Sequence, residues 1–218
     1  MDLLHFFLDV VLHLDRHLVE LLAQYGSFIH VILFLVIFAE TGLVVTPFLP
    51  GDSLLFALGA LAAIDTTGTL TAPGLWAMLS VAAILGNTTN YFIGRFIGDK
   101  AFSGRYRLIS VDYLRRTEGW FERHGPATIV LSRFAPIVRT FAPFIAGIGH
   151  MPRMRFIGYT AVGGLGWVGL FVWGGYLFGN LPLIRNHFGL VTIGIILVSM
   201  MPMVVMWLKD RAARNAGV

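Results

Sequence analysis

The sequence predicts an all-α membrane protein arranged as an inverted repeat, with one domain covering residues 1–218. Hydrophobic residues make up 56% of the chain and charged residues only 13%, a balance outside the usual range of soluble domains. Several long stretches carry no charge, while two shorter apolar segments contain prolines and charges of opposite sign. We therefore expect an N-terminal amphipathic helix, two re-entrant proline-broken hairpins and three full transmembrane helices.

Residues 1–25 are predicted to form the amphipathic helix. Charged and histidine side chains recur at intervals of three and four residues between Asp2 and Glu20, which leaves leucine and phenylalanine on the other faces. A helix with one polar and one apolar face is typical of a segment that lies in the membrane interface rather than across it.

The first re-entrant hairpin is predicted at residues 28–64. Its two apolar arms, 28–39 and 54–63, are each much shorter than the stretch of about 20 residues that a transmembrane helix needs. The break between them contains Pro47, Pro50 and Gly51. Because proline cannot continue a helix hydrogen-bond ladder, the chain is expected to turn there and return to the side from which it entered.

Residues 74–94, 157–181 and 188–208 are long enough to be the three full spans. The connection 95–126 is rich in arginine, and the tail 209–218 is also basic. Basic connections stay in the cytoplasm, so both segments are expected there.

The second hairpin is predicted at residues 127–151, with its break at Pro136, Pro143 and Gly147. Both of its flanks are basic, which favours entry from the cytoplasm, whereas counting spans places the mouth of the first hairpin outside. The chain is thus expected to form a hairpin and a span that enter from one side, then a hairpin and a span that enter from the other. Many secondary transporters have this inverted symmetry, and their substrate site lies between the broken elements.

Four charged residues mark these two hairpins. Glu40 and Asp52 flank the first break, and Arg133 and Arg139 flank the second. An ionised side chain at membrane depth costs roughly 3 kcal/mol, so the four together are expected to serve a function. The arginine fork suits phosphate oxygens, and intramembrane carboxylates commonly relay protons. We therefore assign phosphate binding to the arginines and proton coupling to the acids; static ion pairs that only hold the hairpins together are the alternative.

Other functional classes are disfavoured by composition. The chain has no cysteine, which excludes disulfides and thiolate metal sites, and we expect neither a metal nor a cofactor. No nucleic-acid surface is expected, because the net charge of +4 is modest and most of its excess lies in the connections between apolar segments. No nucleophile or base motif of a membrane phosphatase or acyltransferase accompanies the arginines, so we do not expect an enzyme.

The charged segments resemble the signatures of the DedA family of bacterial inner-membrane proteins, relatives of the VTT-domain lipid scramblases. The resemblance rests on ETGLVVTPFLPGD from Glu40 to Asp52, RFAPIVRTFAP from Arg133 to Pro143, and GNTTNYFIGR at 86–95. It implies a multi-pass transporter of the inner membrane that is linked to the proton-motive force, envelope integrity and recycling of undecaprenyl phosphate. It also implies that Glu40, Asp52, Arg133 and Arg139 are essential.

From these observations we expect translocation of undecaprenyl phosphate or another anionic lipid with coupling to protons. A proton-coupled antiporter of a small solute or cation, which would maintain membrane potential, uses the same residues and stays open as the alternative. The direction of transport, the driving ion, its stoichiometry and self-association of the chain also stay open.

Overall fold

The computed structural model describes residues 14–43, 51–102, 127–133, 136–182, 184, 189–195 and 197–198. This part of the chain is helical and contains no strand, which confirms the all-α prediction. Pro47, Pro50, residues 1–13 of the amphipathic segment, most of the basic connection and the tail 209–218 lie outside the described residues. The helices are α2 (Leu14–Tyr25), α3 (Ile29–Gly42), α4 (Gly51–Ile64), α5 (Ala72–Phe102), α7 (Ala127–Ser132), α8 (Pro136–Ile148) and α9 (Arg153–Phe178).

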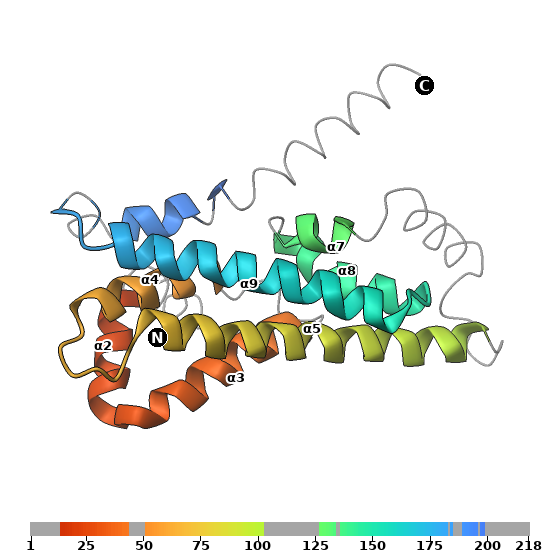
Figure 1. Ribbon diagram of the computed structural model, residues 1–218, viewed down its shortest axis with the longest axis horizontal. Coiled ribbons are helices and arrows are strands. Elements are labelled where there is room, and N and C mark those ends of the chain that lie inside the picture. The colour runs from red at the N-terminus through yellow and green to blue at the C-terminus, as the bar shows by residue number, and fades with distance from the viewer. Residues whose placement is uncertain are drawn as a thin grey trace, which may run out of the picture.

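The N-terminal helices change direction near residues 25–28, where we expected the boundary between the amphipathic helix and the first hairpin. There the short 3-10 helix η1 (Gly26–Phe28) joins α2 to α3 without interruption. The two helices meet there at a bend (Figure 1). Gly26 adopts a φ of 51°, a conformation that glycine reaches without steric cost, and this allows the bend.

Two helical stretches among the described residues are long and apolar enough to cross a membrane, namely His17–Gly42 and Arg153–Phe178. The second corresponds to the predicted span 157–181. The first includes the bend at η1, so its straight pieces of 12 and 14 residues reach only about 18 and 21 Å. That is less than the hydrocarbon thickness of about 30 Å.

Helix α5 is longer than the span 74–94 that we predicted. It continues to Phe102, so the first residues of the predicted connection 95–126 are helical. At the end of the predicted span, Gly94 brings α5 against the backbone of Phe144 in α8, and Arg95 donates to the hydroxyl of Tyr91 at 3.0 Å. The polar second half of α5 keeps it outside the set of helices that are apolar enough to span on composition alone.

We predicted the break of the second hairpin at Pro136, Pro143 and Gly147. α7 ends at Ser132 and α8 begins at Pro136, so Pro136 stands at the break. Pro143 and Gly147, which we expected at the break, instead lie inside α8. Proline removes one hydrogen bond from a helix, but the close packing of α8 on α5 holds the helix together on both sides of Pro143.

Helix contacts follow a repeating scheme. The second arm of each hairpin packs mainly on the long helix of the other half, so that α4 lies on α9 and α8 lies on α5. The first arm contacts the long helix of its own half, as α3 does with α5 and α7 does with α9. The long helices α5 and α9 also pack on each other, and Figure 1 shows them running along the length of the molecule.

Glycines permit the closest helix approaches. A Cβ on Gly59 of α4 would overlap the carbonyl of Val172 in α9, and one on Gly175 of α9 would overlap the carbonyl of Phe56 in α4. Gly94 and Gly147 are opposed in the same way between α5 and α8. Small residues that let backbones touch are a hallmark of helix association in membranes, where lipid removes the usual hydrophobic drive.

The turn between α4 and α5 is ordered by one carboxylate. Asp65 accepts hydrogen bonds from the Thr67 amide at 2.8 Å, the Thr67 hydroxyl at 2.6 Å and the Leu70 amide at 2.6 Å. The Thr67 hydroxyl, followed by the amides, holds the pKa of the Asp65 carboxyl below its usual value. The turn thus sets where α5 begins after the first hairpin.

A polar layer lies between two apolar clusters. One cluster contains buried residues of α3, α4 and α9 together with the first half of α5; the other gathers around Tyr91, Ile129 and Phe156. Along α5 the buried Asn87 and Asn90 fall between the two clusters, and along α9 the buried Thr160 does so. Since both helices pass through both clusters, the polar layer crosses them near their midpoints.

Candidate functional site

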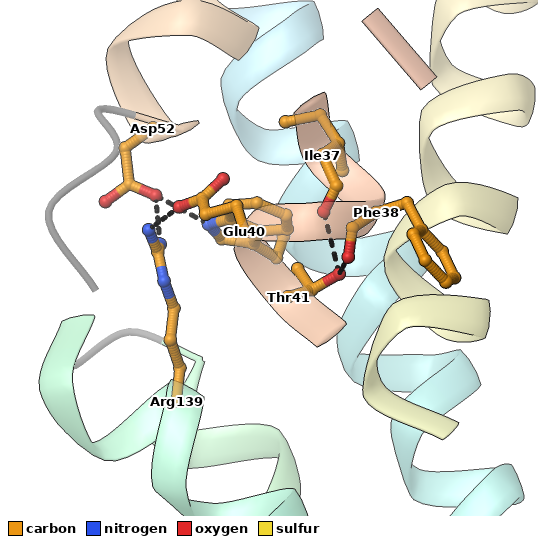
Figure 2. A network of polar contacts seen from close by, with 7 residues as sticks. Ile37, Phe38, Glu40, Thr41, Asp52 and Arg139 are labelled. Carbon is orange, nitrogen blue, oxygen red and sulfur yellow. Dashed lines mark hydrogen bonds and ion pairs between the residues drawn. The ribbon is translucent and has the colours of Figure 1, made fainter. Parts of the chain in front are cut away.

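Arg139 of α8 reaches between the two acids of the first hairpin (Figure 2). Its Nη2 forms an ion pair with Oε1 of Glu40, and its Nη1 forms one with Oδ1 of Asp52. Glu40 lies in the last turn of α3 and Asp52 in the first turn of α4. A single guanidinium therefore joins the two arms of the first hairpin to the second hairpin.

All four charged residues predicted from the sequence are buried. Their exposed fractions are 1% for Glu40, 7% for Asp52, 3% for Arg133 and 8% for Arg139. The structure brings Glu40, Asp52 and Arg139 into direct contact. Arg133 lies in the same polar layer, but the part of the chain that the structure describes shows no ion pair between it and an acid.

The helix dipoles act in opposite directions on the two acids. Asp52 occupies the first turn of α4, where the helix dipole favours negative charge, whereas Glu40 is close to the carboxyl end of α3, where the dipole opposes it. Gly51 leaves room for the Glu40 carboxylate, because a Cβ at that position would overlap its oxygens.

Trp167 of α9 connects the charged groups. Its indole Nε1 donates to Oδ1 of Asp52 at 2.9 Å. The guanidinium carbon of Arg139 lies 5.0 Å from the centroid of the indole ring, and that of Arg133 lies 5.8 Å from it. Cation–π attraction operates within about 6 Å, so one buried ring contacts both arginines and one of the acids.

Two asparagines of α5 bind backbone carbonyls near the end of α3 and within α8. Asn90 donates to the carbonyls of Thr140 at 2.8 Å and Thr41 at 3.4 Å. With its amide oriented to satisfy both neighbours, Asn87 donates to the Thr41 carbonyl at 3.2 Å and accepts from Nη2 of Arg133 at 2.8 Å. The last backbone carbonyls of a helix have no hydrogen-bond partner within that helix. At the end of α3, the asparagine side chains of α5 donate to the carbonyl of Thr41.

Arg133 has a distinct set of neighbours. Besides Asn87, its Nη2 donates to the Thr160 carbonyl at 3.3 Å. Its Nε is buried and has no hydrogen-bond partner, and the same is true of the Thr160 hydroxyl oxygen. Gly163 and Gly164 give the side chain its space, since a Cβ on either would come within 3.1 to 3.3 Å of it.

Sequence reasoning singled out the charges but missed Trp167 and Thr160. Trp167 had one local signal, because it stands in a glycine-rich stretch where a large side chain has room to fill. Thr160 had none. Asn87 and Asn90 were recognisable within the segment at 86–95, although their bonds to the hairpin backbones were not. In the described ranges, no three His, Asp or Glu side chains gather closely enough to hold a metal ion.

Comparison of the sequence with known proteins identifies its family. Residues 49–177 match the VTT domain, a stretch that includes Asp52, both arginines and Trp167. Protein DedA of Escherichia coli strain K12 is 48% identical over 219 residues, which cover 100% of both chains. The chain belongs to the DedA family. Glu40 precedes the domain match, but the alignment with DedA covers it.

Further relatives of this DedA family protein are also named as membrane proteins. An uncharacterized membrane protein of Mycobacterium tuberculosis strain H37Rv is 38% identical over 88% of this chain and 85% of its own. The inner membrane protein YghB of Escherichia coli strain K12 is 35% identical over 82% of each chain. No solved structure matches. The family and its relatives support the prediction of a membrane protein.

Proposed function

We propose that this DedA family protein carries an anionic lipid, with undecaprenyl phosphate as its substrate, across the bacterial inner membrane in exchange with protons. Glu40 and Asp52 exchange the protons, and the buried arginines supply the positive charge for the phosphate. The proposal is carried by one observation, namely that two carboxylates and two guanidinium groups from both hairpins meet in a buried layer.

Energetics favour a functional role for this layer over a purely structural one. Buried ion pairs seldom stabilise a protein more than well-packed apolar residues would, so a structural role alone gives little reason to keep four buried charges. Their place near the midpoints of α5 and α9 also matches the midplane sites of transporters with broken helices. Phosphate binding and proton exchange account for all four charges without a chemical step, so we propose transport rather than catalysis.

We also propose the membrane topology that the sequence predicts, with three spans, two hairpins that enter from opposite sides and a cytoplasmic C-terminus. The repeating scheme of helix contacts supports two related halves. The positive-inside rule supports a cytoplasmic location for the basic residues Arg153 and Arg155, which follow the second hairpin. Counting spans from there supports an outer location for the turn between α4 and α5.

Cysteine labelling tests this topology directly, because the chain contains no cysteine. Thr66→Cys lies in the turn between α4 and α5, and Met154→Cys lies at the start of α9; both native residues are exposed. We expect an impermeant thiol reagent added to intact cells to label the first and not the second, and the reverse in inverted membrane vesicles. The unsubstituted chain serves as the blank, and labelling of both positions from one side would contradict the topology.

Translocation of a labelled undecaprenyl phosphate analogue in proteoliposomes, with and without an imposed pH gradient, tests the transport function. We expect the gradient to accelerate translocation by the native chain. Glu40→Gln and Asp52→Asn should each abolish that acceleration while leaving folded protein, because the amides keep the shape of the acids and lose only the ionisable group. Acceleration that persists in both variants would remove these acids from the coupling.

The same assay decides against the alternative function. A proton-coupled antiporter of a small solute or cation would use the same buried acids, and the enclosure of all four charges by protein suits such a substrate as well. We expect no translocation of the lipid analogue if that is the function. Proton flux driven by a solute or cation, in liposomes that show no lipid movement, would favour the antiporter.

A further inference from the structure

The two buried arginines are not equivalent. Arg139 is engaged by both carboxylates, one on each of its terminal nitrogens. Arg133 has no acid partner among the described residues, and its bonds to Asn87 and the Thr160 carbonyl all use Nη2. The cost of burying Arg133 is thus offset only partly by the neutral groups around it.

Unsatisfied polar atoms gather beside Arg133. Its Nε, with an exposed fraction of 3% for the whole residue, has no acceptor, and the buried hydroxyl oxygen of Thr160 has no partner. A guanidinium carries five N–H donors, and those on Nε and Nη1 remain available after Nη2 is used. Buried polar atoms without partners are rare in proteins and call for an explanation, of which a ligand is one.

Charge balance separates the two arginines further. Glu40 and Asp52, when ionised, exceed the charge of Arg139 by one, and Arg133 brings the layer to neutrality. An anion at Arg139 must compete with the two carboxylates that already neutralise it. An anion at Arg133 meets no such competitor, because no carboxylate contacts that guanidinium within the described residues.

We propose that Arg133, together with the Thr160 hydroxyl and the Asn87 amide, forms the subsite for a phosphate monoester head group, while Arg139 serves to neutralise the two acids. This narrows the assignment of phosphate binding from both arginines to one. The identity of the lipid that carries the phosphate rests on the proposed function. The binding of a phosphate monoester at Arg133 does not. Trp167, which contacts both guanidinium groups, places the subsite beside the acid cluster.

Equilibrium binding to the purified full chain in a neutral detergent tests the subsite. The probe is dodecyl phosphate, and dodecanol is the uncharged match of the same chain length. We expect Arg133→Gln to weaken dodecyl phosphate binding by about tenfold or more, because it removes charge-assisted hydrogen bonds. Glu40→Gln/Asp52→Asn/Arg139→Gln, which keeps Arg133 and removes an acid cluster whose net charge is −1 when both acids are ionised, should bind dodecyl phosphate at least as tightly as the native chain.

Two further variants keep the test decisive. Arg155→Gln removes an exposed arginine and controls for general attraction of the anionic probe to surface charge; it should bind as the native chain does. Arg133→Lys keeps the charge but loses the planar fork, so it should show intermediate binding even if the Gln variant is too unstable to measure. Gel filtration and thermal unfolding establish which variants are folded.

Several results would overturn the subsite. These are unchanged binding by folded Arg133 variants, an equal loss in the triple variant, equal affinity of the native chain for dodecanol, and no binding of dodecyl phosphate at all. Failure of the transport function is a separate result. A native chain that binds dodecyl phosphate through Arg133 but moves no lipid in proteoliposomes would keep the subsite and contradict the carrier.

Discussion

Arg139→Gln should lower the free energy of unfolding by about 3–5 kcal/mol, the largest effect that we expect from a single side chain in the buried layer. The substitution leaves Glu40 and Asp52 close together without their shared guanidinium, in a place where their exposed fractions are 1% and 7%. Thermal unfolding of the detergent-solubilised chain, monitored by circular dichroism, measures the loss.

Neutralising the acids should rescue that variant. Glu40→Gln/Asp52→Asn added to Arg139→Gln removes the unpaired charges, so we expect most of the lost stability to return. The double acid variant with Arg139 intact is the matched control, since it leaves a buried cation instead of buried anions. A triple variant that is no more stable than Arg139→Gln would show that the loss comes from packing rather than from unpaired charge.

Gly175→Ala should destabilise the protein by about 1–3 kcal/mol, because a Cβ there would overlap the carbonyl of Phe56 and force α4 and α9 apart. The two helices make one of the most extensive contacts in the described part of the fold, and Asp52 lies in the first turn of one of them. We therefore expect the same variant to weaken transport as well, through displacement of Asp52 from Trp167 and Arg139.

Gly166→Ala is the matched control on the same helix. No atom lies within 4 Å of the position that its Cβ would occupy. Alanine favours a helix over glycine by up to about 1 kcal/mol, so this variant should be neutral or slightly more stable. Similar destabilisation by both substitutions would mean that α9 tolerates no added methyl group for reasons other than its contact with α4.

Several features of this protein could be predicted from its sequence. The composition indicated a helical membrane protein, and the cost of intramembrane charge singled out the four buried charged residues as candidates. Apolar run lengths located both hairpin arms approximately. These inferences succeed because composition, run length and charge are local properties that the chain displays in order.

Other features were predicted wrongly from the sequence or could not be recognised in it. The prolines and glycine predicted a break at Pro136, Pro143 and Gly147. Pro136 begins α8, but the packing of α8 on α5 keeps the helix continuous through Pro143 and Gly147. There a long-range contact outweighs a local preference, and local patterns contain no information about it. Helix α5 also continues to Phe102, beyond the predicted span 74–94.

By itself, then, the sequence determined the class of fold and the identity of the buried charges. Only the tertiary structure decided which arginine pairs with which acids. Arg139 meets Asp52 and Glu40 across separations of 87 and 99 residues, and it does so while Arg133 contacts neutral groups instead. The two arginines are alike in chemistry, so only the position of Arg139 on α8, from which its side chain reaches Glu40 and Asp52 (Figure 2), distinguishes their roles.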